Sequence, residues 1–85
     1  MEPDKEKLNL LILNYNQDKI IEAKKIAEKL LKEFPDSSLL NNIFGVINYR
    51  TNNNLNAIKY FKRAIKISPN KVDAYNNIGI AYNEI

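Results

Sequence analysis

The amino-acid sequence predicts an all-α protein of five helices that pair into antiparallel hairpins. Apolar residues recur three and four positions apart, as on one face of a helix, and no strand-like alternation lies between these stretches. Only two glycines and three prolines interrupt the 85 residues. Three residue pairs recur at a common offset of 34 positions: Ala23 and Ala57, Pro35 and Pro69, and Gly45 and Gly79. The chain is therefore expected to be an array of repeated helix hairpins.

The composition is that of one small globular domain, and it excludes most catalytic chemistry. Hydrophobic residues make up 45% of the chain, which argues against disorder. The sequence has no cysteine and no histidine, which removes thiolate sites and the commonest general base and metal ligand. Pairs such as Glu28 and Lys32 have the spacing of surface ion pairs on a helix. We predict that the protein is not an enzyme and holds no cofactor or metal.

Charge and hydropathy predict a cytoplasmic location. The formal net charge is +3, which is too mild to indicate nucleic acid as the main partner. Residues 1–4 are acidic where a signal peptide would be basic. No apolar run approaches the roughly 20 residues that cross a bilayer. We expect no membrane partner.

The first two helices are expected over residues 4–15 and 18–34. Pro35 ends the second helix, because it lacks a backbone donor and disfavours helix at the residue before it. Asp36 or Ser37 is the predicted cap of the next helix, since either side chain can accept a hydrogen bond from a free backbone amide.

The third and fourth helices are expected over residues 38–50 and 54–67. The polar run from residue 51 to 54 makes the turn between them, because asparagine tolerates left-handed backbone. Pro69 follows the fourth helix. Asn70 is the predicted cap of a fifth helix over the remaining residues.

These residues resemble the tetratricopeptide repeat (TPR). In that repeat the first helix carries a large aromatic, a Leu-Gly pair and a tyrosine, and the second carries alanine, an aromatic and alanine before a proline. Residues 38–71 supply Phe44, Gly45, Ala57, Phe61, Ala64 and Pro69. Residues 72–85 supply Tyr75, Ile78, Gly79 and Tyr82. Residues 4–37 supply Ala23 and Pro35.

The resemblance implies a single domain, residues 1–85, folded as a short right-handed α-solenoid of about two and a half units. The units are a repeat at 4–37, a repeat at 38–71 and a half repeat at 72–85. The first unit departs from the pattern, with Leu11 where glycine is expected and Ala27 where the aromatic is expected. We interpret these two residues as an exchange of volume across one hairpin.

The resemblance also implies a partner-binding groove. In the family, the first helices of the hairpins line a concave surface that holds an extended peptide or a partner's helix. The matching positions here combine apolar side chains, amides and tyrosines, a mixture that suits a peptide's side chains and backbone. The predicted groove residues are Leu8, Ile12, Tyr15, Leu39, Asn42, Val46, Tyr49, Arg50, Asn76, Ile80 and Asn83.

We consider three functions, and the one that the resemblance favours is a scaffold that binds a protein or peptide partner in this groove. The rival is self-assembly as a homo-oligomer through the fifth helix, which has no hairpin partner within the 85 residues. The residues expected at such a contact are Ile78, Tyr82 and Ile85. The alternatives to self-assembly are that the natural chain continues beyond these residues or that the fifth helix serves as a simple cap. RNA binding by a related helical repeat ranks last, because Arg50 and Lys5 are too few to make a basic groove.

Two further features of the sequence do not change this interpretation. Family members that clamp a C-terminal carboxylate carry specific basic and amide side chains, and none of these is present at the matching positions, which are Leu8, Ile12, Ile43, Asp73 and Asn77. Basic residues also gather on the second helix of each hairpin, at Lys24, Lys25, Lys29, Lys32, Lys59, Lys62, Arg63 and Lys66. Such a face could attract nucleic acid or anionic lipid. We interpret it as a solvated surface that keeps a small repeat soluble.

Overall fold

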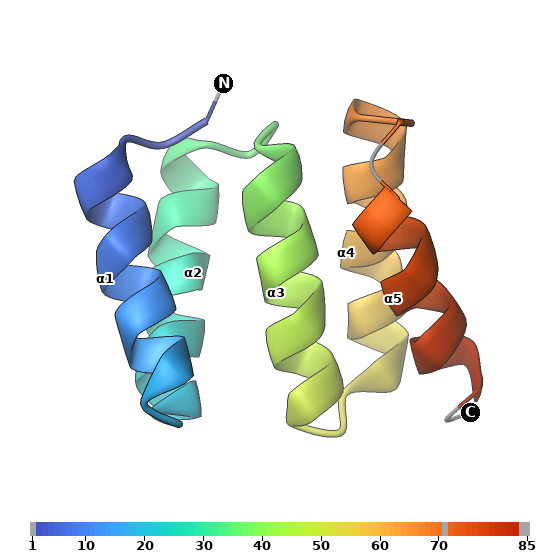
Figure 1. The fold of residues 1–85 in the computed structure, drawn as a ribbon, viewed down its shortest axis with the longest axis horizontal. Coiled ribbons are helices and arrows are strands. Elements are labelled where there is room, and N and C mark those ends of the chain that lie inside the picture. Colours follow the sequence, from blue (N-terminus) through green and yellow to red (C-terminus); the bar gives the residue numbers. More distant parts are fainter. Residues whose placement is uncertain (1, 71, 84–85) are drawn as a thin grey trace.

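The protein is described here by a computed structural model, which covers residues 2–70 and 72–83, without the side chains of residues 72–74 and 82. These residues form five α-helices and no strand (Figure 1). The all-α prediction is therefore confirmed. The helices are α1 (Lys5–Asn16), α2 (Ile20–Glu33), α3 (Ser38–Arg50), α4 (Asn54–Ile67) and α5 (Val72–Asn83).

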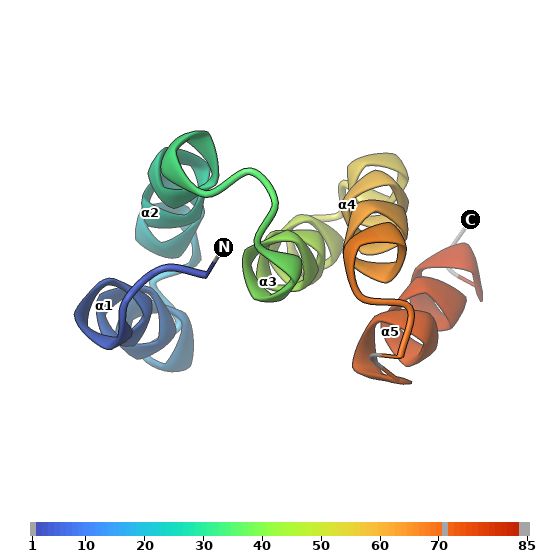
Figure 2. The same ribbon diagram turned by 90° about the horizontal axis from the view of Figure 1, so that it is seen from above.

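The helices alternate in direction along the array. Seen from above, α2 and α4 lie on one side of the molecule and α1 and α5 lie on the other, with α3 between the two rows (Figure 2). We call the first helices of the three units, α1, α3 and α5, the inner layer, and we call α2 and α4 the outer layer. No Cα atom of α1 comes within 8 Å of one in α3, whereas α3 and α5 do approach to that distance. The handedness of the predicted superhelix remains a prediction.

The helix ends follow the local chemistry of the sequence, with one correction. Asp4 caps α1 by accepting from the Lys7 amide at 3.0 Å. Of the two predicted caps for α3, Ser37 makes the bond, with its Oγ accepting from the Leu40 amide at 3.0 Å. The expected start of the second helix at residue 18 is wrong, because Asp18 has a left-handed φ of 59° that a helix does not allow.

The turn between α3 and α4 is the asparagine-rich run that the sequence indicated. Asn52 has a φ of 63°, in the left-handed region. Asparagine accepts this conformation more readily than other residues with a Cβ, because its short side chain can hydrogen-bond locally. The turn thus brings α4 back against α3 without a glycine.

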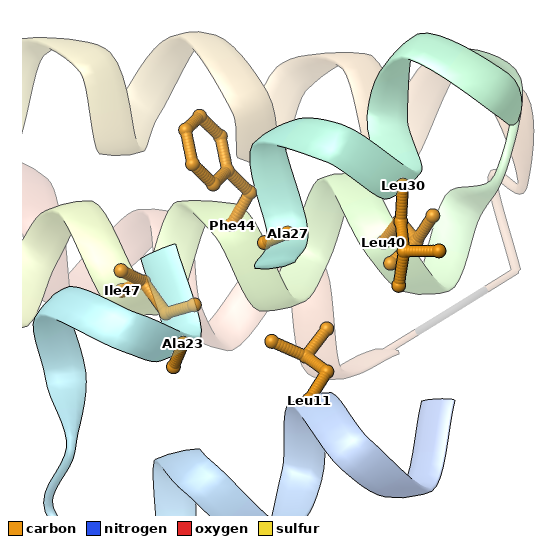
Figure 3. Packing of buried hydrophobic residues seen from close by; sticks show 7 residues of the cluster. All are labelled: Leu11, Ala23, Ala27, Leu30, Leu40, Phe44 and Ile47. Carbon is orange, nitrogen blue, oxygen red and sulfur yellow. The ribbon is translucent and has the colours of Figure 1, made fainter. Parts of the chain in front are cut away.

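The first hairpin packs a core around one leucine. Leu11 is fully buried, and in Figure 3 it points from α1 toward α2 and α3. Two small residues of α2, Ala23 and Ala27, are also fully buried in this cluster. Figure 3 shows the side chains that complete it, which are Leu30, Leu40, Phe44 and Ile47.

The second hairpin packs its core around one aromatic ring. Phe61 of α4 is 1% exposed and lies directly against the backbone of Gly45 in α3. A Cβ built on Gly45 would lie 2.5 Å from the Phe61 Cδ1 atom, which is closer than real atoms pack. Ala57 and Ala64 are fully buried on the same side of α4. Glycine therefore sets the distance between α3 and α4.

The start of the chain is tied to the start of α3. The Glu2 carboxylate accepts hydrogen bonds from the Ser37 hydroxyl and from the Ser38 amide, the latter at 3.0 Å. Pro3 is buried beside them. A carboxylate at this place is favourable, because the first amides of a helix carry partial positive charge. We call residues 2–4 the N-terminal strap.

Two buried asparagines occupy positions where the TPR pattern has aromatics. Asn41 is fully buried, and its amide nitrogen donates to the Ser37 carbonyl at 2.7 Å and to the Pro35 carbonyl at 3.1 Å. Asn48 is 1% exposed and donates to the Phe44 carbonyl at 2.8 Å. These bonds satisfy the amide nitrogens and lower the cost of burying them. Among the described residues, the Asn41 Oδ1 atom is buried without a hydrogen-bond partner.

Candidate functional site

The inner layer carries two adjoining hollows that share two side chains. The first, of about 200 Å³, lies between α1 and α3 and is lined by Ile12, Tyr15, Asn42, Ile43 and Val46. The second, of about 240 Å³, is lined by Tyr15, Val46, Tyr49, Arg50, Phe61, Asn77 and Ile80. Because Tyr15 and Val46 belong to both, the hollows form one surface from α1 to α5. We call this surface the groove.

The lining of the groove is mainly apolar and in part open to solvent. Ile12 is 41% exposed and Ile80 is 48% exposed, so both side chains are accessible to solvent and to a partner. Each hollow is smaller than the roughly 300 Å³ at which drug-sized ligand pockets begin. The dimensions therefore suit a single large side chain better than a small-molecule ligand.

Arg50 forms a polar bridge at one edge of the groove. Its Nη2 lies 2.9 Å from Asp18 Oδ1, and its guanidinium lies 4.9 Å from the centre of the Tyr15 ring. The hydrogen bond to Asp18 raises the pKa of the Arg50 guanidinium, and a hydrogen bond with Tyr15 adds to this effect. The left-handed turn at Asp18 places the carboxylate where Arg50 can reach it. The bridge joins the first hairpin to α3.

An amide pair crosses the groove between α3 and α5. The Asn77 Nδ2 atom donates to Asn42 Oδ1 at 3.1 Å. Both residues are half-buried. Amide groups at this position can exchange hydrogen bonds with the backbone of a bound segment, since that backbone presents both donors and acceptors.

The structure brings together seven of the eleven predicted groove residues. Those that line the hollows are Ile12, Tyr15, Asn42, Val46, Tyr49, Arg50 and Ile80. The other four line neither hollow: Leu8 and Leu39 are half-buried, and Asn76 and Asn83 are exposed. A role in binding stays a prediction for all eleven.

Three lining residues were absent from the predicted groove. Ile43 and Asn77 directly follow the predicted residues Asn42 and Asn76, so a small rotation of each helix decides which neighbour faces the groove. Helical spacing could have suggested both. Phe61 lies on α4, a helix of the outer layer, and contributes to the floor of the second hollow although its side chain is only 1% exposed. The aromatic pattern alone marked it as core.

The residues predicted for self-association are only partly described. Ile78 is half-buried and packs against the core cluster of the second hairpin. The side chain of Tyr82 and the whole of Ile85 lie outside the described residues. Gly79 presents an open surface, since a Cβ built there meets no atom within 4 Å.

Neither a metal-binding cluster nor a membrane-spanning helix occurs in the part of the chain that the structure describes. Within residues 2–70 and 72–83, no three or more Asp, Glu, His or Cys side chains gather as metal ligands would. No helix described above combines the length and the hydrophobicity needed to cross a bilayer.

Comparison with known proteins agrees with the repeat pattern. The family model described as "TPR repeat" matches residues 45–85, which run from Gly45 in α3 through α4 and α5. A search of curated proteins finds no significant match to the chain. TPR repeats generally mediate protein–protein interaction and form a non-enzymatic repeat family. The match over residues 45–85, together with the five antiparallel helices, supports the assignment of this chain to the tetratricopeptide repeat family.

Proposed function

We propose that the groove binds a short apolar segment of a partner protein, either an extended peptide or one face of a helix. The observation that carries this proposal is the continuity of the two hollows through Tyr15 and Val46. In this proposal the units at residues 4–37, 38–71 and 72–85 each contribute their first helix to the groove.

Binding would draw on three features of the lining. An apolar side chain of the partner that enters the first hollow is stabilised by about 25 cal/mol for each Å² of apolar surface it buries. A second apolar side chain can pack on Ile80, which is 48% exposed. The amide of Asn42 lines the first hollow and that of Asn77 lines the second, and both offer hydrogen bonds to the partner's backbone.

A peptide library displayed on phage and selected on the immobilised protein tests the proposal. Selected peptides would be titrated into isotope-labelled protein and followed by NMR. We expect the amide shifts to centre on Ile12, Val46 and Ile80. The Val46→Asp variant should weaken binding at least about tenfold, because a bound apolar side chain would desolvate the new carboxylate.

A matched control comes from an apolar residue on another helix. Ile21 lies on α2, is 58% exposed and lines neither hollow. The Ile21→Asp variant should therefore bind the selected peptides as the unmodified protein does. Peptides that shift the amides of α2 and α4, or that bind Val46→Asp with full affinity, would contradict the proposal.

Self-association through α5 is a second candidate, favoured by the open surface at Gly79. The repeat-equivalent glycine, Gly45, is covered by the Phe61 ring, whereas nothing lies within 4 Å of a Cβ at Gly79. Tyr75 and Ile80 are each 48% exposed on the same helix. A second copy packing on this face would bury these side chains.

Light scattering across a range of concentrations tests this second candidate. A dimer that the Gly79→Lys variant dissociates would support it, since a lysine fits at Gly79 in the free protein but blocks close approach. Ile21→Lys is the control with the same added charge. A monomer at all concentrations would contradict it.

A further inference from the structure

Helix α4 carries a row of cations whose use the groove does not explain. Four cationic residues of α4 share one side of the helix, because successive members are three, one and three residues apart. They are Lys59, Lys62, Arg63 and Lys66. All four are exposed. The opposite side of α4 packs into the core, and α4 belongs to the outer layer (Figure 2). We call these four residues the α4 ridge.

Helix α2 occupies the equivalent place in the first hairpin but carries balanced charges. It contains three glutamates among its four lysines. At the offset of 34 residues, Glu28 of α2 corresponds to Lys62 of α4. Helix α4 contains no acidic residue, and none occurs from Ser37 to Val72. Because like charges one turn apart repel, a helix that needed charge only for solubility would gain from the balanced pattern of α2.

The surroundings hold the ridge at the outer surface. Lys59 Nζ lies 5.6 Å from the centre of the Tyr60 ring, and the Arg63 guanidinium lies 5.5 Å from it. Asp36 lies with Arg63 and Lys66 around a shallow hollow and offsets part of the charge at that end. Within α4 itself, every charged residue is a cation.

Apolar side chains flank the ridge at both ends. Leu55 precedes Lys59 by one turn and is 76% exposed. Ile67 follows Arg63 by one turn and is 38% exposed. Exposed apolar side chains beside a row of cations can add apolar contact to an electrostatic attraction toward a lipid surface.

We propose that the α4 ridge docks the protein reversibly on an anionic lipid surface. Four Lys and Arg residues on one amphipathic helix reach the number at which attraction to anionic headgroups becomes effective. Leu55 adds apolar contact with the lipid. This inference replaces the expectation from sequence that the outer face is only solvated and has no membrane partner. Docking through the outer layer would leave the groove on the inner layer accessible.

Nucleic acid fits the same surface less well. Phosphates give no apolar contact to Leu55. Single strands are usually held by stacking of bases on aromatic rings, but Tyr60 is half-buried and already packs edge-on against Phe44 at 4.6 Å. The ridge therefore offers charge to a nucleic acid without a stacking platform.

Sedimentation with lipid vesicles tests the proposal. Vesicles of phosphatidylcholine alone are compared with vesicles that contain about 30% phosphatidylserine, a lipid of the anionic class that polybasic segments attract. We expect the protein to sediment only with the anionic vesicles, and less so as salt is raised. The K59E/K66E variant should lower the partition coefficient about tenfold or more.

The repeat supplies a matched control. Lys25 and Lys32 are the α2 residues equivalent to Lys59 and Lys66, and both are exposed. The K25E/K32E variant changes the net charge by the same amount, so it should keep most of the binding if α4 is the docking surface. Circular dichroism would establish that both variants fold.

Three outcomes would overturn the proposal. These are equal sedimentation with both kinds of vesicle, equal loss of binding in the two double variants, and tighter binding to a single-stranded RNA oligonucleotide than to the anionic vesicles. None of them bears on the groove, because the peptide titration uses a different surface and different variants.

Discussion

The two hairpins fill the same space with opposite distributions of volume. In the second hairpin α3 contributes a glycine and α4 contributes the Phe61 ring, which lies against that glycine. In the first hairpin α1 contributes Leu11, and α2 contributes Ala27 at the position equivalent to Phe61. Both Leu11 and Ala27 are fully buried. The structure supports the interpretation of an exchange of volume, and it teaches that the total volume matters more than which helix supplies it.

The largest expected effect comes from removing the aromatic of the second hairpin. Phe61→Ala should lower the free energy of unfolding by about 3–5 kcal/mol, because a cavity remains where the ring was. Urea unfolding followed by circular dichroism measures the change. A loss below about 1 kcal/mol would contradict the view that this ring holds α3 against α4.

A smaller effect comes from adding volume to the same hairpin. Gly45→Leu should lower stability by about 1–3 kcal/mol, because the new side chain overlaps the Phe61 ring. Equilibrium unfolding is again the measurement. The matched control is Gly79→Leu, which meets open space at the equivalent position and should not destabilise the protein.

The double variant Gly45→Leu/Phe61→Ala sharpens the comparison further. It gives the second hairpin the same pair of residues that the first hairpin has at positions 11 and 27. If volume can be exchanged across a hairpin, the double variant should be clearly more stable than the sum of the single losses predicts. Additive losses would mean that the backbone spacing of the two hairpins differs too much for the exchange.

The N-terminal strap should contribute about 1 kcal/mol. Glu2→Gln removes the negative charge that the first amides of α3 favour, and it weakens the hydrogen bonds to Ser37 and Ser38. Thermal unfolding measures the effect. Glu6→Gln is the control, since Glu6 is exposed in the first turn of α1 and lies outside the strap. Equal effects of the two substitutions would contradict a specific role for the strap.

The smallest effect concerns an ion pair on the first hairpin. Lys7 Nζ lies 3.0 Å from Glu33 Oε2, and this hydrogen bond raises the pKa of Lys7 above its ordinary value of 10.5. A raised pKa means that the stabilisation is fully present below pH 10.5 and is lost as the pH rises through the pKa of the folded protein. Lys7→Met should therefore be slightly less stable than the unmodified protein at pH 7, with the difference shrinking in strongly alkaline buffer. If the difference in stability between the two proteins did not change with pH, the effect of Lys7→Met would come from lost packing and not from the ion pair.

Much of the fold could be predicted from the sequence, because helix boundaries depend on neighbours along the chain. Pro35 and Ser37 mark the end of α2 and the start of α3 through chemistry that acts within one turn. The left-handed Asn52 follows from the same local reasoning. The turn at Asp18 could not be predicted, because a polar side chain at this position is compatible with either a helix or a turn. The left-handed backbone of Asp18 keeps this residue out of α2.

The groove could be predicted only in part. The TPR pattern identified Val46 and Ile80 by position, yet Ile43 and Asn77 line the hollows through the rotation of α3 and α5. That rotation depends on how side chains pack between helices, as with Phe61 against Gly45. A pattern of positions along one helix does not contain this information.

The sequence by itself determined the number of helices, most of their ends and their apolar faces, because these depend on interactions within a few residues. Only the tertiary structure decided what joins distant segments. The Glu2 carboxylate meets α3, and Arg50 meets Asp18 and Tyr15. Such contacts form only after the hairpins have packed, since their partners lie about one repeat apart in the chain and no local rule brings them together.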